Sequence, residues 1–250
     1  MGWQRDLPDI RDYTPETKKI EKFFHKSKAL NPPKAGVKKS KDLTKWCSPI
    51  EDQGSLGSCT ANAGVGIIEY YERRAFGQHL DASRLFLHKL TRRLLHWTDD
   101  TGAWLRTTMK AMVLLGIPPE EFYPYDTAKF DDEPSALSYA FAQNYQTINC
   151  YRLDRTNVSS KQLLALIKNF LAAGYPSMFG FTVYNFGNDK GEFEFPGPRD
   201  TVQDGHAVVA FGYDDNRKIG KEKGALKIRN SWGVSWGEVG SLCLCGGGAH

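Results

Sequence analysis

Residues 53–63 read QGSLGSCTANA, a tight Gly/Ser turn that runs directly into an apolar segment of helical spacing. The pattern predicts a helix that ends near Gly77, with basic residues in its last turn. Ser58 is a suitable N-cap, which places Cys59 in the first turn. Unpaired backbone N–H groups and the positive end of the helix dipole stabilise an anion there, so a thiolate is favoured over a thiol.

A lone cysteine in an apolar helix is often simply a buried small side chain. Two features of this turn favour a nucleophile instead. Gly54 and Gly57 leave room for a substrate backbone, and Gln53 carries an amide that could point at the group the sulfur attacks. A nucleophilic cysteine also needs a base, which must come from elsewhere in the chain.

Two later segments supply the missing groups. Residues 204–213 read DGHAVVAFGY, and the apolar run predicts a buried strand with His206 at its start. Residues 225–233 read ALKIRNSWG, whose alternation predicts a half-buried strand that ends at Asn230. Each segment alone is weak evidence, but the three in this order indicate a nucleophile, a base and a group that orients the base.

These segments resemble the papain family of cysteine peptidases, in its bacterial branch. QGSxGSC matches the nucleophile turn, GHAV the base strand and NSWGxxWG the orienting strand. His206 lies 147 positions after Cys59, within the spacing of about 130–150 typical of the family, and Asn230 lies 171 positions after it. The match covers roughly residues 43–242. Thr60 departs from the Trp or Tyr usual in the family, so packing around the first helical turn must differ.

The resemblance implies an α+β, papain-like two-lobe fold. A helical lobe over about 43–145 and an antiparallel β-barrel-like lobe over about 146–250 would flank the active-site cleft. It implies a cysteine endopeptidase in which Cys59 forms a thioester, His206 acts as acid and base, and Asn230 orients His206. The Gln53 amide and the Cys59 backbone N–H would form the oxyanion hole. No cofactor and no metal are expected.

The same resemblance implies a substrate groove. Gly102 and Ala103 match the turn whose backbone pairs with the substrate chain, and Trp104 and Leu105 match residues that wall the specificity pocket. Trp104 could equally be a core aromatic. Trp232 would shield the His–Asn hydrogen bond from water. The substrate-binding residues so implied are Gly57, Ser58, Gly102, Ala103, Trp104, Leu105, Gly205 and Trp232.

Residues 1–42 form an extension ahead of the catalytic body, with 11 Lys/Arg against 6 Asp/Glu. A short amphipathic helix is expected within residues 15–29. One interpretation is a strap that packs on a lobe or is disordered. The other is a zymogen-like inhibitory segment, extended across the cleft and anchored by Trp3 and the Phe23–Phe24 pair.

The remaining pattern predicts helices at 81–97, 101–116 and 160–172, strands at 148–153 and 178–184, and a loop at 186–200 that borders the cleft. Residues 38–41 are expected to be a solvated linker. After Gly240 the chain ends in Cys243-Leu244-Cys245 and a glycine run, which suggests a truncated β lobe without its outer strand. Cys243, Cys245 and His250 fit no zinc spacing well.

Composition sets the broad class. The chain has 250 residues, is 40% hydrophobic and has a mean hydropathy of −0.49, with no apolar run long enough to span a membrane. No signal peptide is evident, so a cytoplasmic location is the default unless a leader has been removed. The five cysteines are expected to form no disulfides. The expected partners are a peptide or protein substrate and the chain's own N-terminal segment, with no nucleic acid and no membrane, for a monomer.

Other functions remain open on the sequence alone. A catalytically silent papain-fold binding or regulatory protein is the main alternative, although all four chemical residues are present. Transglutaminase-type transfer usually pairs histidine with aspartate, and Asn230 speaks against it. Amidase or aminopeptidase action would need a cleft closed at one end.

Overall fold

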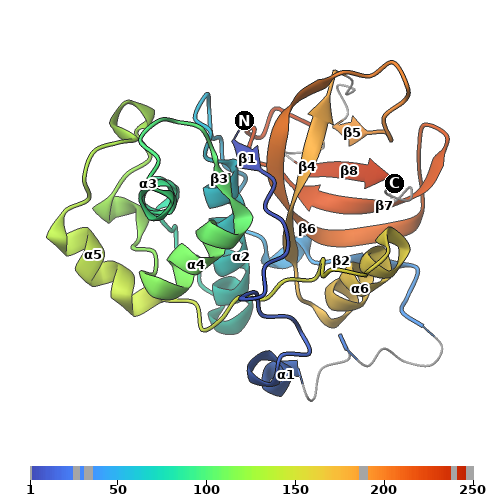
Figure 1. Cartoon of the computed structure of the whole chain (residues 1–250), viewed down its shortest axis with the longest axis horizontal. Helices are drawn as coiled ribbons and strands as arrows, with labels where there is room; N and C mark the ends of the chain where they lie inside the picture. The colour runs from blue at the N-terminus through green and yellow to red at the C-terminus, as the bar shows by residue number, and fades with distance from the viewer. Residues whose placement is uncertain (1, 25–28, 31–35, 186–190, 238–240, 246–250) are drawn as a thin grey trace.

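The computed structural model describes residues 2–24, 29–30, 36–185, 191–237 and 241–245, the last by backbone alone. Two lobes stand side by side (Figure 1), as expected for a papain-like α+β chain. The helical lobe contains α2 (Cys59–Phe76), α3 (Arg84–Leu95), α4 (Leu105–Leu114) and α5 (Ala136–Ala142). Short 3-10 turns are η1 (Thr44–Trp46), η2 (Glu120–Phe122), η3 (Thr127–Lys129) and η4 (Gln143–Tyr145).

Helix ends follow the capping residues in the sequence. α2 ends at Gly77, whose left-handed conformation (φ 71°) lets its N–H donate to the carbonyl of Arg73. α3 begins after Ser83, whose hydroxyl accepts from the backbone of Phe86. α6 (Ser160–Ala173), the helix of the β lobe, begins with a capping box between Ser159 and Gln162.

The β lobe contains β2 (Ser40–Asp42), β4 (Ser177–Tyr184), β5 (Glu192–Phe193), β6 (Val202–Ile219), β7 (Glu222–Arg229) and β8 (Ser241–Cys245). The strand order is β2-β6-β7-β8-β5, with β4 also paired to β6. All these pairs are antiparallel except β5 with β8. Among the described strands the sheet does not close, so the expected barrel-like lobe is an open, six-stranded sheet.

Two local expectations are wrong. Residues 148–153 form no strand, because Tyr151 instead packs on Phe24 and Phe170. The linker expected at 38–41 contains β2, which pairs with β6 through the register Lys41 to Tyr213. Cys243 and Cys245 lie in β8, which pairs with β7.

α2 lies between the lobes and carries apolar side chains toward both. Val65 packs with Leu87 and Met112 in the core of the helical lobe. On another side, Ala63 and Ile67 pack with Val209 of β6. The first residue of α2 is therefore held at the junction of the lobes. None of the helices that the structure describes combines the length and the apolar character needed to cross a membrane.

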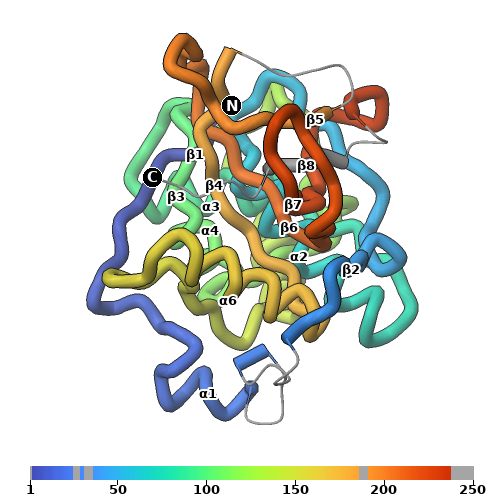
Figure 2. Tube along the Cα trace, turned by 90° about the vertical axis from the view of Figure 1, so that its right-hand side faces the viewer, coloured from blue at the N-terminus to red at the C-terminus, as the bar shows by residue number. Residues whose placement is uncertain are grey.

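The N-terminal segment crosses the front of the molecule. β1 (Trp3–Gln4) pairs in parallel with β3 (Ala103–Trp104), and Figures 1 and 2 show the chain continuing down to α1 (Lys18–Phe24). Phe24 is buried against Phe170 of α6. Phe23 is 54% exposed, so the expectation that it anchors this segment is wrong.

Candidate active site

Cys59 is the first residue of α2 and is fully buried. Ser58 occupies the N-cap position, but its side chain makes no capping bond. Its hydroxyl is instead 2.6 Å from the Tyr125 hydroxyl and 3.0 Å from Nδ2 of Asn62. The backbone N–H groups of Ala207 and Thr60 lie close enough to the Cys59 sulfur to lower the pKa of its thiol. Because Ala207 follows His206 on β6, the sulfur lies beside the strand that carries the imidazole.

His206 is fully buried near the start of β6, opposite Phe181 of β4. Its Nε2 lies 2.6 Å from Oδ1 of Asn230, the residue that follows β7. Its Nδ1 has no hydrogen-bond partner among the described residues. One ring nitrogen is thus held by a carboxamide, and the other is available to exchange a proton.

Two tryptophans of the NSWGxxWG motif cover the imidazole. The Trp232 ring stacks on the His206 ring with centroids 4.6 Å apart and an interplanar angle of 25°. Trp236 meets Trp232 edge-on at 4.5 Å. These rings lie over the imidazole that is bonded to Asn230, and in low-dielectric surroundings such a hydrogen bond is stronger than in water.

Gln53 is tied to the Asn230 segment by backbone and side chain. Its backbone N–H donates to the carbonyl of Ser231 at 2.8 Å, and its Oε1 accepts from the Ser231 hydroxyl at 2.6 Å. Nε2 donates to the carbonyl of Leu56 at 2.9 Å. An amide nitrogen carries two hydrogens, so this bond leaves a second N–H to donate. Ser231 was not singled out from the sequence, although it lies inside the motif.

Burial decides the charge of the catalytic pair in this arrangement. It raises the pKa of the Cys59 thiol to about 12, although the N–H groups of Ala207 and Thr60 act in the other direction. Burial lowers the pKa of His206 to about 4 despite the hydrogen bond to Asn230. The expectation that the helix terminus favours a thiolate is therefore wrong for this state, because desolvation outweighs the dipole. Both groups are neutral at pH 7.

Two of the residues implied for substrate binding are neighbours, since a Cβ on Gly57 would lie 3.3 Å from the Gly102 nitrogen. The Gly57 backbone N–H donates to the Asp100 carboxylate at 2.8 Å, a contact the sequence did not predict. Ala103 and Trp104 form β3, and the Trp104 ring meets Trp97 edge-on at 5.5 Å. Half-buried Leu105 begins α4.

Residues 2–4 lie between Gly102 of the helical lobe and Gly205 of the β lobe. The Ala103 N–H donates to the Gly2 carbonyl at 2.6 Å, and the Gly2 N–H donates to the Gly205 carbonyl at 3.3 Å. A Cβ on Gly102 would collide with the Gly2 carbonyl, and one on Gly205 with the Trp3 carbonyl. One on Gly180 would collide with the Trp3 indole. Residues 2–4 therefore bridge the helical lobe and the β lobe.

Ion pairs hold the next part of this segment. Arg106 of α4 donates two hydrogen bonds of 2.7 Å to the Asp12 carboxylate. Arg152 lies 3.0 Å from the Asp6 carboxylate and donates to the Asp6 carbonyl at 2.7 Å. Burial acts to raise the pKa of Asp12, but the bonds from Arg106 hold it below its usual value. All four side chains are largely buried.

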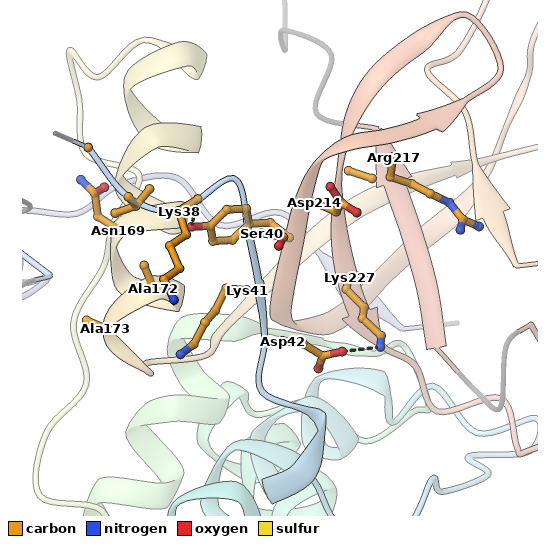
Figure 3. A pocket seen from close by; sticks show the side chains of 14 residues that line it. Lys38, Ser40, Lys41, Asp42, Asn169, Ala172, Ala173, Asp214, Arg217 and Lys227 are labelled. Carbon is orange, nitrogen blue, oxygen red and sulfur yellow. Dashed lines mark hydrogen bonds and ion pairs between the residues drawn. The ribbon is translucent and has the colours of Figure 1, made fainter.

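A separate cavity of about 670 Å³ lies between β2, α6 and the β6–β7 pair. Lys38, Lys41 and Asn169 border it in Figure 3, which also shows Asp42 paired with Lys227 at 2.9 Å. None of the catalytic side chains lines it. This cavity could not be predicted from the sequence, because it depends on the pairing of β2 with β6.

One group in the described part of the chain has the donor types of a metal site. The ligand atoms of Glu69, His79 and Asp81 lie within 4.8 Å of one another. Glu69 already accepts from the Ser48 hydroxyl and the backbone of Ala82. Burial raises the pKa of Glu69 to about 7, so it is often protonated at neutral pH, which weakens it as a ligand.

The described cysteines, Cys47, Cys59 and Cys150, are free thiols.

Comparisons with known proteins agree with this geometry. The sequence matches the family "Papain family cysteine protease" over residues 36–248. It is 32% identical over 252 residues to the uncharacterized peptidase C1-like protein L477 of Acanthamoeba polyphaga mimivirus, covering 95% of this chain and 78% of that protein. It is 26% identical to chymopapain of Carica papaya over 201 residues, 79% of this chain but 51% of that protein.

Among solved structures, the fold is similar to xylellain, a cysteine protease from Xylella fastidiosa. The TM-score is 0.77 at 30% sequence identity, over 98% of this chain and 89% of that chain. The family match covers most of the sequence, and the similarity in structure extends over both lobes. The chain belongs to the papain family of cysteine proteases.

Proposed function

We propose that Cys59, His206, Asn230 and Gln53 carry out the peptide hydrolysis of this cysteine endopeptidase, and that residues 2–4 restrain it. The observation that carries the assignment is the geometry of His206. Asn230 holds Nε2 at 2.6 Å while Nδ1 has no partner among the described residues. The backbone N–H of Ala207, the residue next to His206, also lies close enough to the Cys59 sulfur to act on the pKa of its thiol.

In the first half of the reaction, His206 takes the thiol proton at Nδ1 and the Cys59 sulfur attacks the carbonyl carbon of the peptide. The carbonyl oxygen becomes an oxyanion, which the second Nε2–H of Gln53 and the Cys59 backbone N–H would stabilise. Collapse of this intermediate breaks the C–N bond. His206 gives its proton to the leaving amine, and a thioester to Cys59 remains.

In the second half, a water molecule gives a proton to His206 and attacks the thioester carbon. The same donors stabilise the second oxyanion, and the C–S bond breaks to release the acid and regenerate the thiol. Asn230 accepts from the Nε2–H throughout, which keeps Nδ1 as the nitrogen that moves the proton.

Restraint by the N-terminal segment is the second part of the proposal. Residues 2–4 use the Ala103 N–H and the Gly205 carbonyl, two main-chain groups of the implied substrate groove. Their presence accompanies the burial that keeps Cys59 and His206 neutral. Displacement of this segment would both free the groove and let water reach the pair, which favours the charged thiolate and imidazolium.

Peptide hydrolysis by the full-length chain tests the assignment. We expect cleavage of a peptide library by the unmodified protein and none above background by Cys59→Ala. A Thr91→Val variant, which removes one buried hydrogen bond in α3, serves as the control for general destabilisation and should retain the rate. Cleavage that survives in Cys59→Ala would refute the assignment.

A further inference from the structure

A small cavity lies behind the catalytic pair, between α2 and the sheet. Its volume of about 10 Å³ corresponds to roughly one water molecule. Asn62 of α2 and Asn230 line it together with Ala207 and Val209 of β6. Glu51 and Arg229 add charged groups to its wall. A cavity of this size with several polar neighbours holds water, whereas purely apolar cavities stay dry.

The orientation of the Asn62 amide is fixed by its neighbours. One atom of the amide lies 3.0 Å from the Ser58 carbonyl oxygen. A carbonyl oxygen only accepts, so this atom must be Nδ2. Oδ1 therefore points away from Ser58. It is buried and has no hydrogen-bond partner among the described residues.

The Asn230 amide is fixed in the opposite sense. The backbone N–H of Ser231 donates to one of its side-chain atoms at 2.8 Å, and an N–H needs an acceptor, so this atom is Oδ1. The same oxygen faces Nε2 of His206. Nδ2 is then turned away from the imidazole. It too is buried and unpartnered in the part of the chain that the structure describes.

We propose that a buried water in this cavity accepts from Nδ2 of Asn230 and donates to Oδ1 of Asn62, which makes Asn62 a positioning residue for the catalytic histidine. The two unpartnered atoms are complementary, one a donor and the other an acceptor, and both belong to residues that line a space of the right size. Water is the small molecule that satisfies both at once. The inference rests on the roles proposed above for His206 and Asn230.

The consequence for catalysis follows from the amide. With the water in place, flipping the Asn230 side chain would lose three bonds, to the water, to Ser231 and to His206. A flipped amide would also place its N–H₂ against the Nε2–H of a protonated imidazole, two donors facing each other. Asn62, one helical turn after Cys59, touches neither substrate nor reacting atoms in this scheme. It acts through the water.

The test compares three full-length variants. Asn62→Leu keeps the approximate volume but removes the acceptor together with the donor to Ser58. Asn62→Asp, which burial favours as the protonated acid, keeps an acceptor oxygen and a donor to the Ser58 carbonyl, and Thr91→Val removes one buried hydrogen bond elsewhere. We expect Asn62→Leu to lower kcat about tenfold with KM changed less than twofold. Asn62→Asp should recover most of the rate, and Thr91→Val should match the unmodified protein.

The pH profile separates positioning from general damage. His206 is faced by Asp204 of its own strand and by Asn230. The backbone of its neighbour Ala207 approaches Cys59 of α2, and Glu51 and Arg229 line the cavity. Loss of the oriented acceptor disfavours the imidazolium, so the alkaline limb of kcat/KM should move down by about one pH unit in Asn62→Leu only. If Asn62→Leu folds and its kcat and the pH of its alkaline limb both match the unmodified protein, the inference is overturned.

A structural measurement needs no activity. A high-resolution crystal structure of the full-length protein should show a water within about 2.7–3.2 Å of both Oδ1 of Asn62 and Nδ2 of Asn230. A dry cavity, or a direct bond between the two amides, would refute the inference even if peptide hydrolysis is confirmed. The water found in a protein without peptidase activity would support the site and refute the proposed function instead. If Asn62→Leu does not fold, this measurement on the unmodified chain decides.

Discussion

The backbone N–H of Ala103 donates to the carbonyl oxygen of Gly2 at 2.6 Å, across 101 positions of sequence. This bond belongs to the parallel pair of β1 and β3 and lies at the wall of the implied substrate groove. The protein thus carries its own peptide in the place where the proposed function needs a substrate. The neutral state of Cys59 and His206 accompanies the burial found with this segment in place. The ion pairs of Asp6 and Asp12 hold the same segment.

The anchor at Asp12 predicts how firmly the segment is held. Asp12→Asn keeps the shape of the side chain but removes the charge that faces Arg106. Hydrogen bonds to charged groups contribute about 1.5–3 kcal/mol. We therefore expect the open fraction, and with it the peptidase rate of the full-length chain, to rise roughly tenfold or more in a steady-state assay.

The matched control is Asp9→Asn. Asp9 pairs with Arg11 inside the segment itself, so its loss should leave the rate unchanged. Equal rates for Asp12→Asn and the unmodified protein would argue against restraint by this anchor.

Gln53 predicts a loss of turnover rather than of binding. Gln53→Ala removes one proposed oxyanion donor, and loss of such a donor costs about 100–1,000-fold in kcat. KM should change little, because the donor acts mainly on the transition state. Gln146→Ala, which removes an exposed glutamine bonded to the Leu114 carbonyl, is the control. A rise in KM with kcat intact would assign Gln53 to substrate binding instead.

The buried imidazole predicts that the covered arrangement weakens in acid. Burial lowers the pKa of His206 to about 4, while an exposed imidazole titrates near 6.5. In a Cys59→Ala variant, where no thiolate forms and the imidazole titrates on its own, the open form binds a proton between these values that the covered form does not. The covered form therefore loses stability as pH falls from about 6.5 to 4, by up to about 3 kcal/mol, and is unaffected above 6.5.

Hydrogen exchange of the Ala103 amide measures this opening, because its N–H is bonded to Gly2. In Cys59→Ala, after correction for the intrinsic exchange rate, its protection should fall between pH 7 and pH 4.5. The Leu87 amide, bonded to Ser83 in α3, is the internal control. Global unfolding is a poorer probe, because Glu69, with its pKa raised to about 7, contributes a slope of opposite sign between about pH 4.5 and 7. Constant protection at Ala103 would contradict the prediction.

The two adjacent phenylalanines of α1 predict unequal effects. Phe24 is buried against Tyr151, Phe170 and Tyr175, so Phe24→Ala should destabilise the folded chain by about 3 kcal/mol. Exposed Phe23 should tolerate alanine within about 0.5 kcal/mol. Thermal unfolding of the two variants compares them directly. Similar melting temperatures would mean that α1 is not docked as the structure has it.

Elements with local signals were predictable from the sequence. The ends of α2 and α6 follow Gly77 and the Ser159 capping box, and the apolar runs gave the positions of β4 and β6. The residues proposed as catalytic could be picked from the sequence because each lies in a short motif. These predictions needed only neighbouring residues.

The features that could not be predicted depend on distant contacts. The pairing of Trp3 with Ala103, and of Lys41 with Tyr213, joins segments whose own patterns are weak. Tyr151 does not form the expected strand because its ring packs against Phe24 in an aromatic cluster. The thiol pKa of Cys59 was misjudged for the same reason, since burial depends on everything that covers the sulfur.

Alkylation of Cys59 by a peptidyl epoxide, followed by mass spectrometry, tests the central claim most directly. We expect the full-length protein to be labelled slowly at Cys59. Trp3→Ala, which removes the indole held against Gly180, should be labelled at the same residue about tenfold faster. Equal rates in the two proteins, or no label at Cys59 in either, would contradict a peptidase held in check by its own N-terminal segment.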